Sequence, residues 1–166
     1  TERMRITSGG DVLIGTTAVV SSSQGGAEFL AGESGGRRIL RLATTNTSVN
    51  DLVVFINGNG TVGTIRTNGS STSYNTSSDY RLKEDLQDFA GLDMVSKIPV
   101  YDFKWKTDES RSYGVMAHEL QEVLPDAVSG DKDAEEMQGV DYSKIVPLLI
   151  KSIQELKAEI DILKAK

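Results

Sequence analysis

Residues 75–86, which read NTSSDYRLKEDL, place two serine hydroxyls, three carboxylates and two cations close together in the chain. A serine hydroxyl becomes an effective nucleophile only when a neighbouring base takes its proton. The same residue types also begin helices, because Ser78 or Asp79 can accept hydrogen bonds from the free amide groups of a first helical turn. This stretch therefore indicates either nucleophilic chemistry or a helix N-terminus, and the elements around it bear on that choice.

The stretch separates two halves of unlike composition. Residues 1–77 are rich in Gly, Ser and Thr and carry six Lys or Arg and five Asp or Glu, a net charge of +1. Residues 78–166 carry twelve and nineteen, a net charge of −7, together with Trp105 and all three prolines. This change predicts a domain boundary between Ser77 and Ser78, with one domain at 1–77 and another at 78–166.

Composition also limits the kinds of site that the chain can build. The 166 residues include no cysteine, so the chain forms no disulfide and offers no thiolate to zinc, and a single histidine disfavours a metal cluster. The net charge of −6 argues against nucleic acid as a partner. There is no run of 18 apolar residues, which argues against membrane insertion. We therefore expect no metal ion and no cofactor.

The first half is predicted to consist of short strands. Runs such as DVLIGTT, RRILRLATT and DLVVFINGNGTVGTIRT are β-prone and are separated by Gly, Asn and Ser. So few large apolar residues bury too little surface to offset the entropy of ordering. The segment is either disordered or completes its core with other copies of itself. The apolar run at residues 53–56 favours an intertwined β-trimer, followed by an exposed connector at residues 70–77.

The second half is predicted to mix helices and strands, which makes the fold class α+β. Leu82, Leu86 and Phe89 recur at helical spacing, which predicts a short helix directly after Ser78. The remaining predictions are a strand at residues 98–105, a strand end, short helix and short strand at residues 112–128 with Pro125 stopping the helix, and a charged loop at residues 129–139.

Near the C-terminus, apolar residues recur at alternating spacings of three and four, the heptad pattern of a coiled coil. Its first turns, IVPLLI, are apolar nearly all round and are expected to pack on their own domain. The later turns carry a narrower stripe suited to self-association. β-branched a and leucine d positions favour two strands, so the seam alone does not establish three. We call the six repeating residues the heptad seam: Val146, Leu149, Ile153, Leu156, Ile160 and Leu163.

Three blocks of the second half resemble one known family, in the right order. The first block fills the pattern Ser-Asp-x-Arg-x-Lys with Ser78, Asp79, Arg81 and Lys83, and the others read YGVMAHELQEVLPDAV and VDYSKIVPLLIKSIQEL. The family is the C-terminal intramolecular chaperone domain of phage endosialidases, tailspikes and L-shaped tail fibres, a group of self-cleaving serine peptidases. One departure is His118, where the family usually has glutamine.

The resemblance implies a single-turnover autoproteolysis by a Ser-Lys dyad. Ser78 would attack the carbonyl carbon of Ser77 with Lys83 as base, while Asp79 and Arg81 support the motif. Water would then resolve the ester, so that the bond between Ser77 and Ser78 is lost and Ser78 becomes a new N-terminus. The alternatives are that Ser78 only caps a helix and that Lys83 is an ordinary surface lysine.

Such a dyad must meet two physical conditions. A free lysine, with a pKa of about 10.4, is neutral only about once in two thousand molecules at pH 7, so Lys83 needs desolvation or a nearby cation such as Arg81. Five helical residues turn through about 500°, so the pair meets only if Ser78 precedes the helix and the chain folds back. Otherwise a neighbouring subunit supplies the lysine. We therefore predict cleavage that depends on assembly.

Together these features predict an intramolecular chaperone that trimerises and folds a phage tail fibre or tailspike and then releases itself. Residues 1–77 would be the distal fibre segment, within a homotrimer whose further partner is a host-surface receptor. The fibre would lie in the virion tail, with assembly and release in the host cytoplasm. Two alternatives are an uncut trimerisation and adhesion module, and a carbohydrate-degrading first half, which its shortness and the lack of a clear carboxylate pair disfavour.

Overall fold

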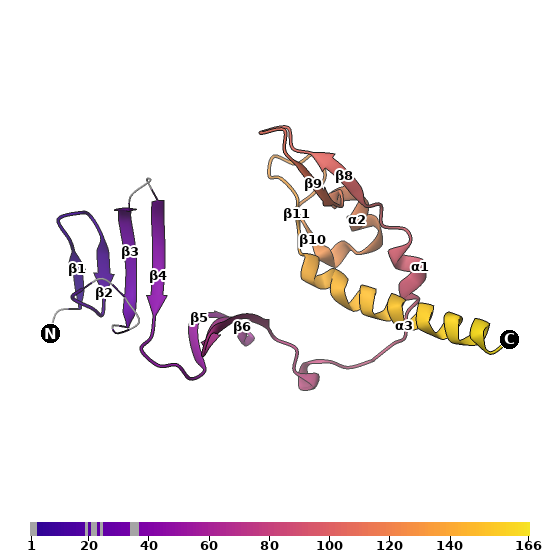
Figure 1. Ribbon diagram of the computed structural model, residues 1–166, viewed down its shortest axis with the longest axis horizontal. Coiled ribbons are helices and arrows are strands. Elements are labelled where there is room, and N and C mark those ends of the chain that lie inside the picture. The colour runs from indigo at the N-terminus through magenta and orange to yellow at the C-terminus, as the bar shows by residue number, and fades with distance from the viewer. Residues whose placement is uncertain (1–2, 19, 21–22, 24, 34–36) are drawn as a thin grey trace. The chain divides into compact units, whose positions relative to one another are not determined.

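The computed structural model describes residues 3–18, 20, 23, 25–33 and 37–166. Contacts divide the chain into two compact units, Thr1–Glu84 and Asp85–Lys166. In Figure 1 the described part of the first unit consists of strands and one short helical turn, and the second mixes helices with short strands. This content agrees with the α+β class. The domain boundary between Ser77 and Ser78, which is inferred from the change in composition, stays a prediction.

The first four strands form an antiparallel sheet in the order β1-β2-β3-β4. Leu13 lies opposite Glu28 in this sheet, and Glu28 lies opposite Arg41. Leu13 and Leu30 are buried and provide its apolar core. The strands are β1 (Met4–Ile6), β2 (Val12–Ile14), β3 (Gly26–Glu33) and β4 (Arg37–Ala43).

The buried carboxylate of Glu28 on β3 joins the loop residue Val20 and the strand β4. Glu28 has no solvent exposure, and it accepts hydrogen bonds from the backbone N–H of Val20 at 3.0 Å and from Arg41 Nη1 at 3.1 Å. A buried carboxylate is tolerated only when it is paired and hydrogen-bonded. These two contacts therefore explain how β3 accommodates a glutamate in its core.

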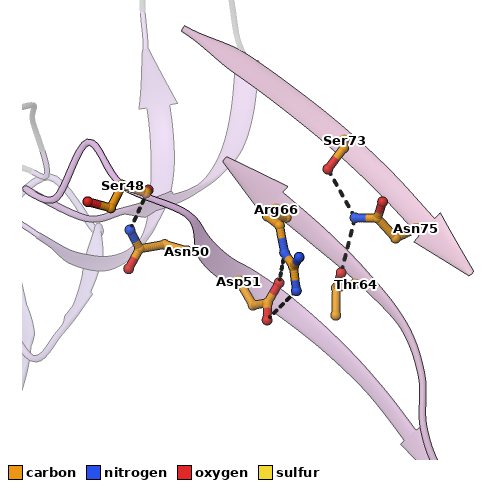
Figure 2. Close-up of polar contacts among 7 residues, drawn as sticks. All are labelled: Ser48, Asn50, Asp51, Thr64, Arg66, Ser73 and Asn75. Atoms are coloured by element: carbon orange, nitrogen blue, oxygen red, sulfur yellow. Dashed lines mark hydrogen bonds and ion pairs between the residues drawn. The ribbon is translucent and has the colours of Figure 1, made fainter. Parts of the chain in front are cut away.

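A second antiparallel sheet has the order β5-β6-β7. Figure 2 shows Arg66 donating to both carboxylate oxygens of Asp51, at 2.6 and 3.1 Å, and Asn75 donating to Thr64 at 3.3 Å and to Ser73 at 3.0 Å. The Arg66 side chain holds the pKa of Asp51 below its ordinary value. Polar side chains therefore cross-link all three strands: β5 (Asn50–Asn57), β6 (Gly60–Asn68) and β7 (Ser71–Thr76).

The last of these strands corrects the prediction of an unpaired connector at residues 70–77. Every residue of β7 is exposed and extended, as predicted, but its backbone pairs with β6 from Asn68 opposite Ser71 to Gly63 opposite Thr76. Backbone N–H and C=O groups alone can form such a ladder, so no apolar period is required. Residues 71–76 are therefore an edge strand of this sheet, and the prediction that they only connect two domains is wrong.

Apolar side chains remain exposed on this second sheet. Val54, Phe55 and Ile56 on β5 are exposed by 45, 51 and 70%. Successive residues of a strand point to opposite faces, so both faces of the sheet carry apolar surface. Removing such apolar surface from water is favourable. Further copies of the chain, as predicted for an intertwined trimer, would bury this surface.

The predicted helix after Ser78 is wrong. Only one turn of 3-10 helix, η1 (Tyr80–Leu82), is present, and residues 83–90 belong to no helix or strand. Asp85 has a φ of +52°, in the left-handed region that a right-handed helix cannot include. Leu82 and Leu86, which the prediction placed on an apolar helical face, are 75 and 87% exposed. Without packing of that face, a short helix has little to stabilise it.

The second unit has a small core of Ile98, Leu120, Ala127 and Leu148. The predicted strands, the helix before Pro125, the charged loop and the C-terminal helix are present, with bounds that differ by a few residues, and the helix α1 was not predicted. Two antiparallel pairs, β8 with β9 and β10 with β11, complete the unit. Its elements are α1 (Gly91–Val95), β8 (Tyr101–Lys104), β9 (Arg111–Gly114), α2 (Ala117–Val123), η2 (Pro125–Ala127), β10 (Val128–Ser129), β11 (Gly139–Val140), η3 (Tyr142–Lys144) and α3 (Ile145–Lys164).

The short helix α1 packs closely on α3. Gly91 is buried, and a Cβ added there would lie 2.6 Å from Lys151 Cγ and 2.9 Å from the backbone nitrogen of Ser152. The Glu155 carboxylate on α3 accepts hydrogen bonds from the N–H groups of Gly91 at 3.2 Å and Leu92 at 2.7 Å. Glu155 therefore caps the beginning of α1, where amide groups have no helical partner.

This cap predicts a pH-dependent stability of the second unit. The Leu92 N–H holds the pKa of Glu155 below its ordinary value of 4.5. A carboxylate with a lowered folded-state pKa adds stability above its ordinary pKa and loses it as the pH falls through the lowered value. We expect Glu155→Gln to lower the thermal midpoint at neutral pH, measured by circular dichroism, and the deficit to shrink below pH 4.5.

The control for this prediction is Glu159→Gln, at an exposed position on the same helix. That change should leave the midpoint close to that of the unchanged chain at both acidic and neutral pH. A Glu155→Gln deficit of the same size at neutral pH and well below the ordinary pKa would contradict the role of the carboxylate charge.

The helix α3 carries the heptad seam on its exposed side. All six seam side chains are between 42 and 67% exposed, whereas Leu148 and Ser152 on the same helix are buried. The helix therefore contacts its own unit through a different face and leaves the seam accessible. Among the described residues, no helix is long and apolar enough to cross a membrane. A coiled coil along the seam stays a prediction.

Candidate active site

The predicted nucleophile and base lie within hydrogen-bond distance in a single chain. Lys83 Nζ donates to Ser78 Oγ at 2.7 Å. The turn η1 between them reverses the chain, and Lys83 follows it in an extended conformation with φ −129° and ψ 132°. The folded-back arrangement that a pair from one chain requires is therefore present. The roles of nucleophile and base stay predictions.

The two supporting residues of the motif form a clamp across the same turn. Arg81 donates from Nε to Asp79 Oδ1 at 2.9 Å and from Nη2 to Oδ2 at 2.7 Å, and its backbone N–H donates to Oδ1 at 2.9 Å. Asp79, one of the two residues that the sequence offers as an N-cap, is thus the N-cap of η1. Hydrogen bonds from the Arg81 side chain hold the pKa of Asp79 below its ordinary value and raise the pKa of Arg81.

A lysine base needs either burial or a nearby cation, and the single chain gives Lys83 neither of these in full. Lys83 and Ser78 are both exposed. The Arg81 guanidinium, predicted as the cation that disfavours a charged Lys83, is paired with Asp79, whose negative charge offsets it. In the observed contact the lysine donates, whereas a base must accept the hydroxyl proton. Burial of the lysine would favour the neutral amine and so permit that reversal.

The residue before the nucleophile is held by β6. The Ser77 N–H donates to the Val62 carbonyl at 3.0 Å, one position beyond the β6–β7 ladder, and the Ser77 hydroxyl donates to the Thr61 carbonyl at 3.2 Å. Sequence reasoning missed Thr61 and Val62, because they contribute backbone carbonyls that no motif marks. Recognising β7 as a strand paired with β6 would have identified them.

An open hollow of about 500 Å³ borders the junction. It is lined by Thr61, Ser77, Asp79, Arg81 and Leu82. Water therefore reaches the acyl side of the junction, which the hydrolysis of an ester at this place would need.

The other predicted residues lie in the second unit. The heptad seam follows α3, and His118 lies on α2 beside a hollow that is also lined by Glu122 and Lys132. Within the described ranges, no three His, Asp or Glu side chains are grouped so that they could hold a metal ion. The structure thus brings Ser77, Ser78 and Lys83 together in the first unit, whereas His118 belongs to the second unit.

Two comparisons relate this chain to known proteins. Residues 78–129 match a family model described as the chaperone of endosialidase. Over 106 residues, the chain is 34% identical to the long tail fiber protein Gp37 of Enterobacteria phage Ox2. The similarity covers 58% of this chain and 42% of that protein, so the chain spans less than half the length of this relative.

Proposed function

Since residues 78–129 match a family model described as the chaperone of endosialidase, we propose that the second half of the chain assembles the first half into a phage tail fibre and then cuts itself away. The family is the one that the Ser-Asp-x-Arg-x-Lys pattern indicated, and that resemblance is confirmed. The observation that carries the cleavage step is the 2.7 Å contact between Lys83 Nζ and Ser78 Oγ, which lies inside the matched segment.

Cleavage proceeds in two steps. Neutral Lys83 takes the hydroxyl proton while Ser78 Oγ attacks the carbonyl carbon of Ser77. The carbon–nitrogen bond then breaks, Lys83 returns the proton to the leaving amine, and the acyl group of Ser77 remains as an ester on Ser78 Oγ. Water hydrolyses this ester. Ser77 ends as a C-terminal carboxylate, and Ser78 regains its hydroxyl beside a new amino group.

Assembly switches this reaction on. In the single chain both members of the dyad are exposed to solvent. Association of three chains through the heptad seam buries surface, and closing neighbours around the junction would desolvate the lysine. The seam is available for this purpose, because its side chains are 42–67% exposed within one chain. Cleavage thereby reports that a homotrimer has formed.

The first half is the product of this assembly. Its three-stranded sheet exposes apolar side chains on both faces, among them Phe55 and Ile56, and these need partner chains to be buried. An intertwined β-trimer supplies such partners. As the distal part of a fibre in the virion tail, this segment would meet a host-surface receptor, while the second half is left in the host cytoplasm after release.

A removable chaperone suits a fibre of this kind. Contacts between separate chains form slowly, and strands of low hydrophobicity can pair in the wrong register. A helical seam that associates first raises the local concentration of the three β segments and aligns them. Once the seam has been cut away, the fibre is protected by slow unfolding instead of by equilibrium stability.

Mass measurement of the purified chain after incubation tests the proposal. We expect two fragments, residues 1–77 and 78–166, and sequencing of the second should begin at Ser78. Both should appear only in preparations that contain the trimer. Fragments that begin at another residue would contradict the assignment of the dyad.

The second candidate function is a trimerisation and adhesion module that stays attached. The exposure of the dyad in the single chain favours it, because an exposed lysine is a poor base. An assembled trimer that remains intact through prolonged incubation, with no ester or fragment detected, would establish this second function instead.

A further inference from the structure

The bond proposed for cleavage is held from both sides. On the amine side, Ser78 accepts a hydrogen bond from Lys83, and the clamp between Asp79 and Arg81 closes the turn that follows Ser78. On the acyl side, Ser77 is held by β6 through one backbone and one side-chain hydrogen bond. The proposed function assigns a task to the amine side only. The hydrogen bonds of Ser77 to β6, on the acyl side, have no role in that mechanism.

The acyl side continues the strand ladder in an unusual way. The regular register of β7 ends with Thr76 opposite Gly63. Ser77 adds one more backbone hydrogen bond, to the Val62 carbonyl at 3.0 Å, and its side chain reaches the next carbonyl, that of Thr61, at 3.2 Å. One residue is thus joined to two successive carbonyls of β6.

Gly63 permits this close approach. A Cβ at that position would lie only 2.9 Å from the carbonyl oxygen of Asn75, so a larger residue would push β7 away from β6 just before the junction. The end of β7 therefore lies tightly against β6 at the point where Ser77 is anchored.

Two anchors on one residue restrict how its carbonyl can move. The backbone bond limits rotation about φ, and the side-chain bond selects one χ1 rotamer of Ser77. Rotation about the φ and χ1 angles of Ser78 remains, and this rotation brings Ser78 Oγ toward or away from the carbonyl carbon, which the two anchors hold against β6. Reactions within one molecule depend strongly on such alignment of the reacting atoms.

We propose that the Ser77 hydroxyl is a positioning group for self-cleavage, which holds the acyl carbon in place through the Thr61 carbonyl while Ser78 attacks. This inference rests on the proposed function. It identifies the residue before the scissile bond as a specificity determinant, so that a hydroxyl-bearing side chain is required there in addition to the nucleophile. It also gives β6 a direct part in the reaction.

The test compares cleavage rates of the full chain with Ser77→Ala and Ser77→Thr. Alanine removes the hydrogen bond to Thr61, and we expect cleavage about fivefold to tenfold slower, the factor that one ordinary hydrogen bond supplies. Threonine keeps a hydroxyl and should restore the rate to within about twofold. The pH dependence of the rate should keep its midpoint in both variants, because Lys83 is unchanged.

The matched control is Ser71→Ala at the other end of β7. Its hydroxyl also donates to a backbone carbonyl of the hairpin, that of Asn68 at 2.9 Å. Both alanine variants should therefore lose a similar, small amount of thermal stability. Only Ser77→Ala should slow cleavage, which separates positioning from a general loosening of the sheet.

The outcomes distinguish this inference from the proposed function. If the unchanged chain cleaves at Ser78 and Ser77→Ala cleaves equally fast, the positioning role is wrong and the dyad stands. Equal slowing by Ser71→Ala and Ser77→Ala would also overturn the inference, because sheet stability would then explain both. If the assembled, unchanged chain never cleaves, the proposed function itself fails.

Discussion

Replacing Ser78 with Ala is expected to stop cleavage, so that the chain stays intact at least about 10³-fold longer than the unchanged chain. The substitution removes the only hydroxyl that Lys83 contacts among the described hydrogen bonds and leaves no atom to carry the ester. Because Ser78 is exposed, the fold and the trimer should form as before. Denaturing electrophoresis over time measures the loss, and native mass measurement verifies assembly.

Two substitutions of Lys83 test whether it acts as a base or only as a positive charge beside Ser78. Lys83→Met removes both charge and base, whereas Lys83→Arg keeps the positive charge but cannot act as a base, because a guanidinium does not deprotonate in proteins. We expect both variants to remain intact. Normal cleavage by Lys83→Arg would contradict a base and indicate a purely electrostatic role.

A serine far from the junction provides the control for Ser78→Ala. The Ser96 hydroxyl donates to the Asp93 carbonyl at 3.0 Å in the second unit. Ser96→Ala should cleave at the ordinary rate. If Ser78→Ala is cleaved at that same rate, Ser78 is not the nucleophile.

Placing a charge in the heptad seam is expected to prevent both assembly and cleavage. Ile153 is 65% exposed in the single chain, so Ile153→Asp leaves the fold of one chain intact. In a coiled coil the same carboxylate would be buried without a partner, which strongly disfavours association. We expect a monomer by analytical ultracentrifugation and a cleavage rate at least about tenfold lower, because the dyad then stays exposed to solvent.

Gln154→Asp is the matched control, since it adds the same charge at the next residue of α3, which is exposed and lies outside the seam. That variant should remain trimeric and cleave normally. Rapid first-order cleavage by monomeric Ile153→Asp would contradict the dependence on assembly while leaving the dyad itself in place.

The C-terminal helix was predictable because its signal is long and repeated. Residues 145–164 give nearly three heptads, and the helix α3 follows them. The helix predicted after Ser78 rested on three apolar residues alone. Their side chains find no apolar partner surface to stabilise a helix, and the left-handed conformation of Asp85 interrupts it. Periodicity predicts a helix reliably only when packing or length supports it.

The strand β7 could not be predicted from its own residues. Ser71–Thr76 has no apolar alternation, and its conformation comes from backbone pairing with β6. That pairing depends on the neighbouring strand and on Gly63, which lets the two backbones approach. Because these determinants lie outside residues 71–76, the residue pattern of this segment alone predicts only an extended conformation.

The candidate site was predictable in its residue types and only partly in its geometry. The Ser-Asp-x-Arg-x-Lys pattern indicated Ser78 and Lys83, but helical geometry placed them on different sides of an axis. A single 3-10 turn, closed by Asp79 and Arg81, brings them to 2.7 Å instead. The carbonyls of Thr61 and Val62 carry no side-chain signal and required the structure.

The irregular segment after the dyad exposes the chain to a second kind of cutting. Residues 83–90 are exposed and lie outside any helix or strand, which are properties of the sites that proteases nick most readily. A protease specific for basic residues would cut after Lys83 and yield fragments of nearly the same size, with Glu84 as the first residue of the second. A precursor that failed to process itself would thus remain open to trimming by its host at almost the same point.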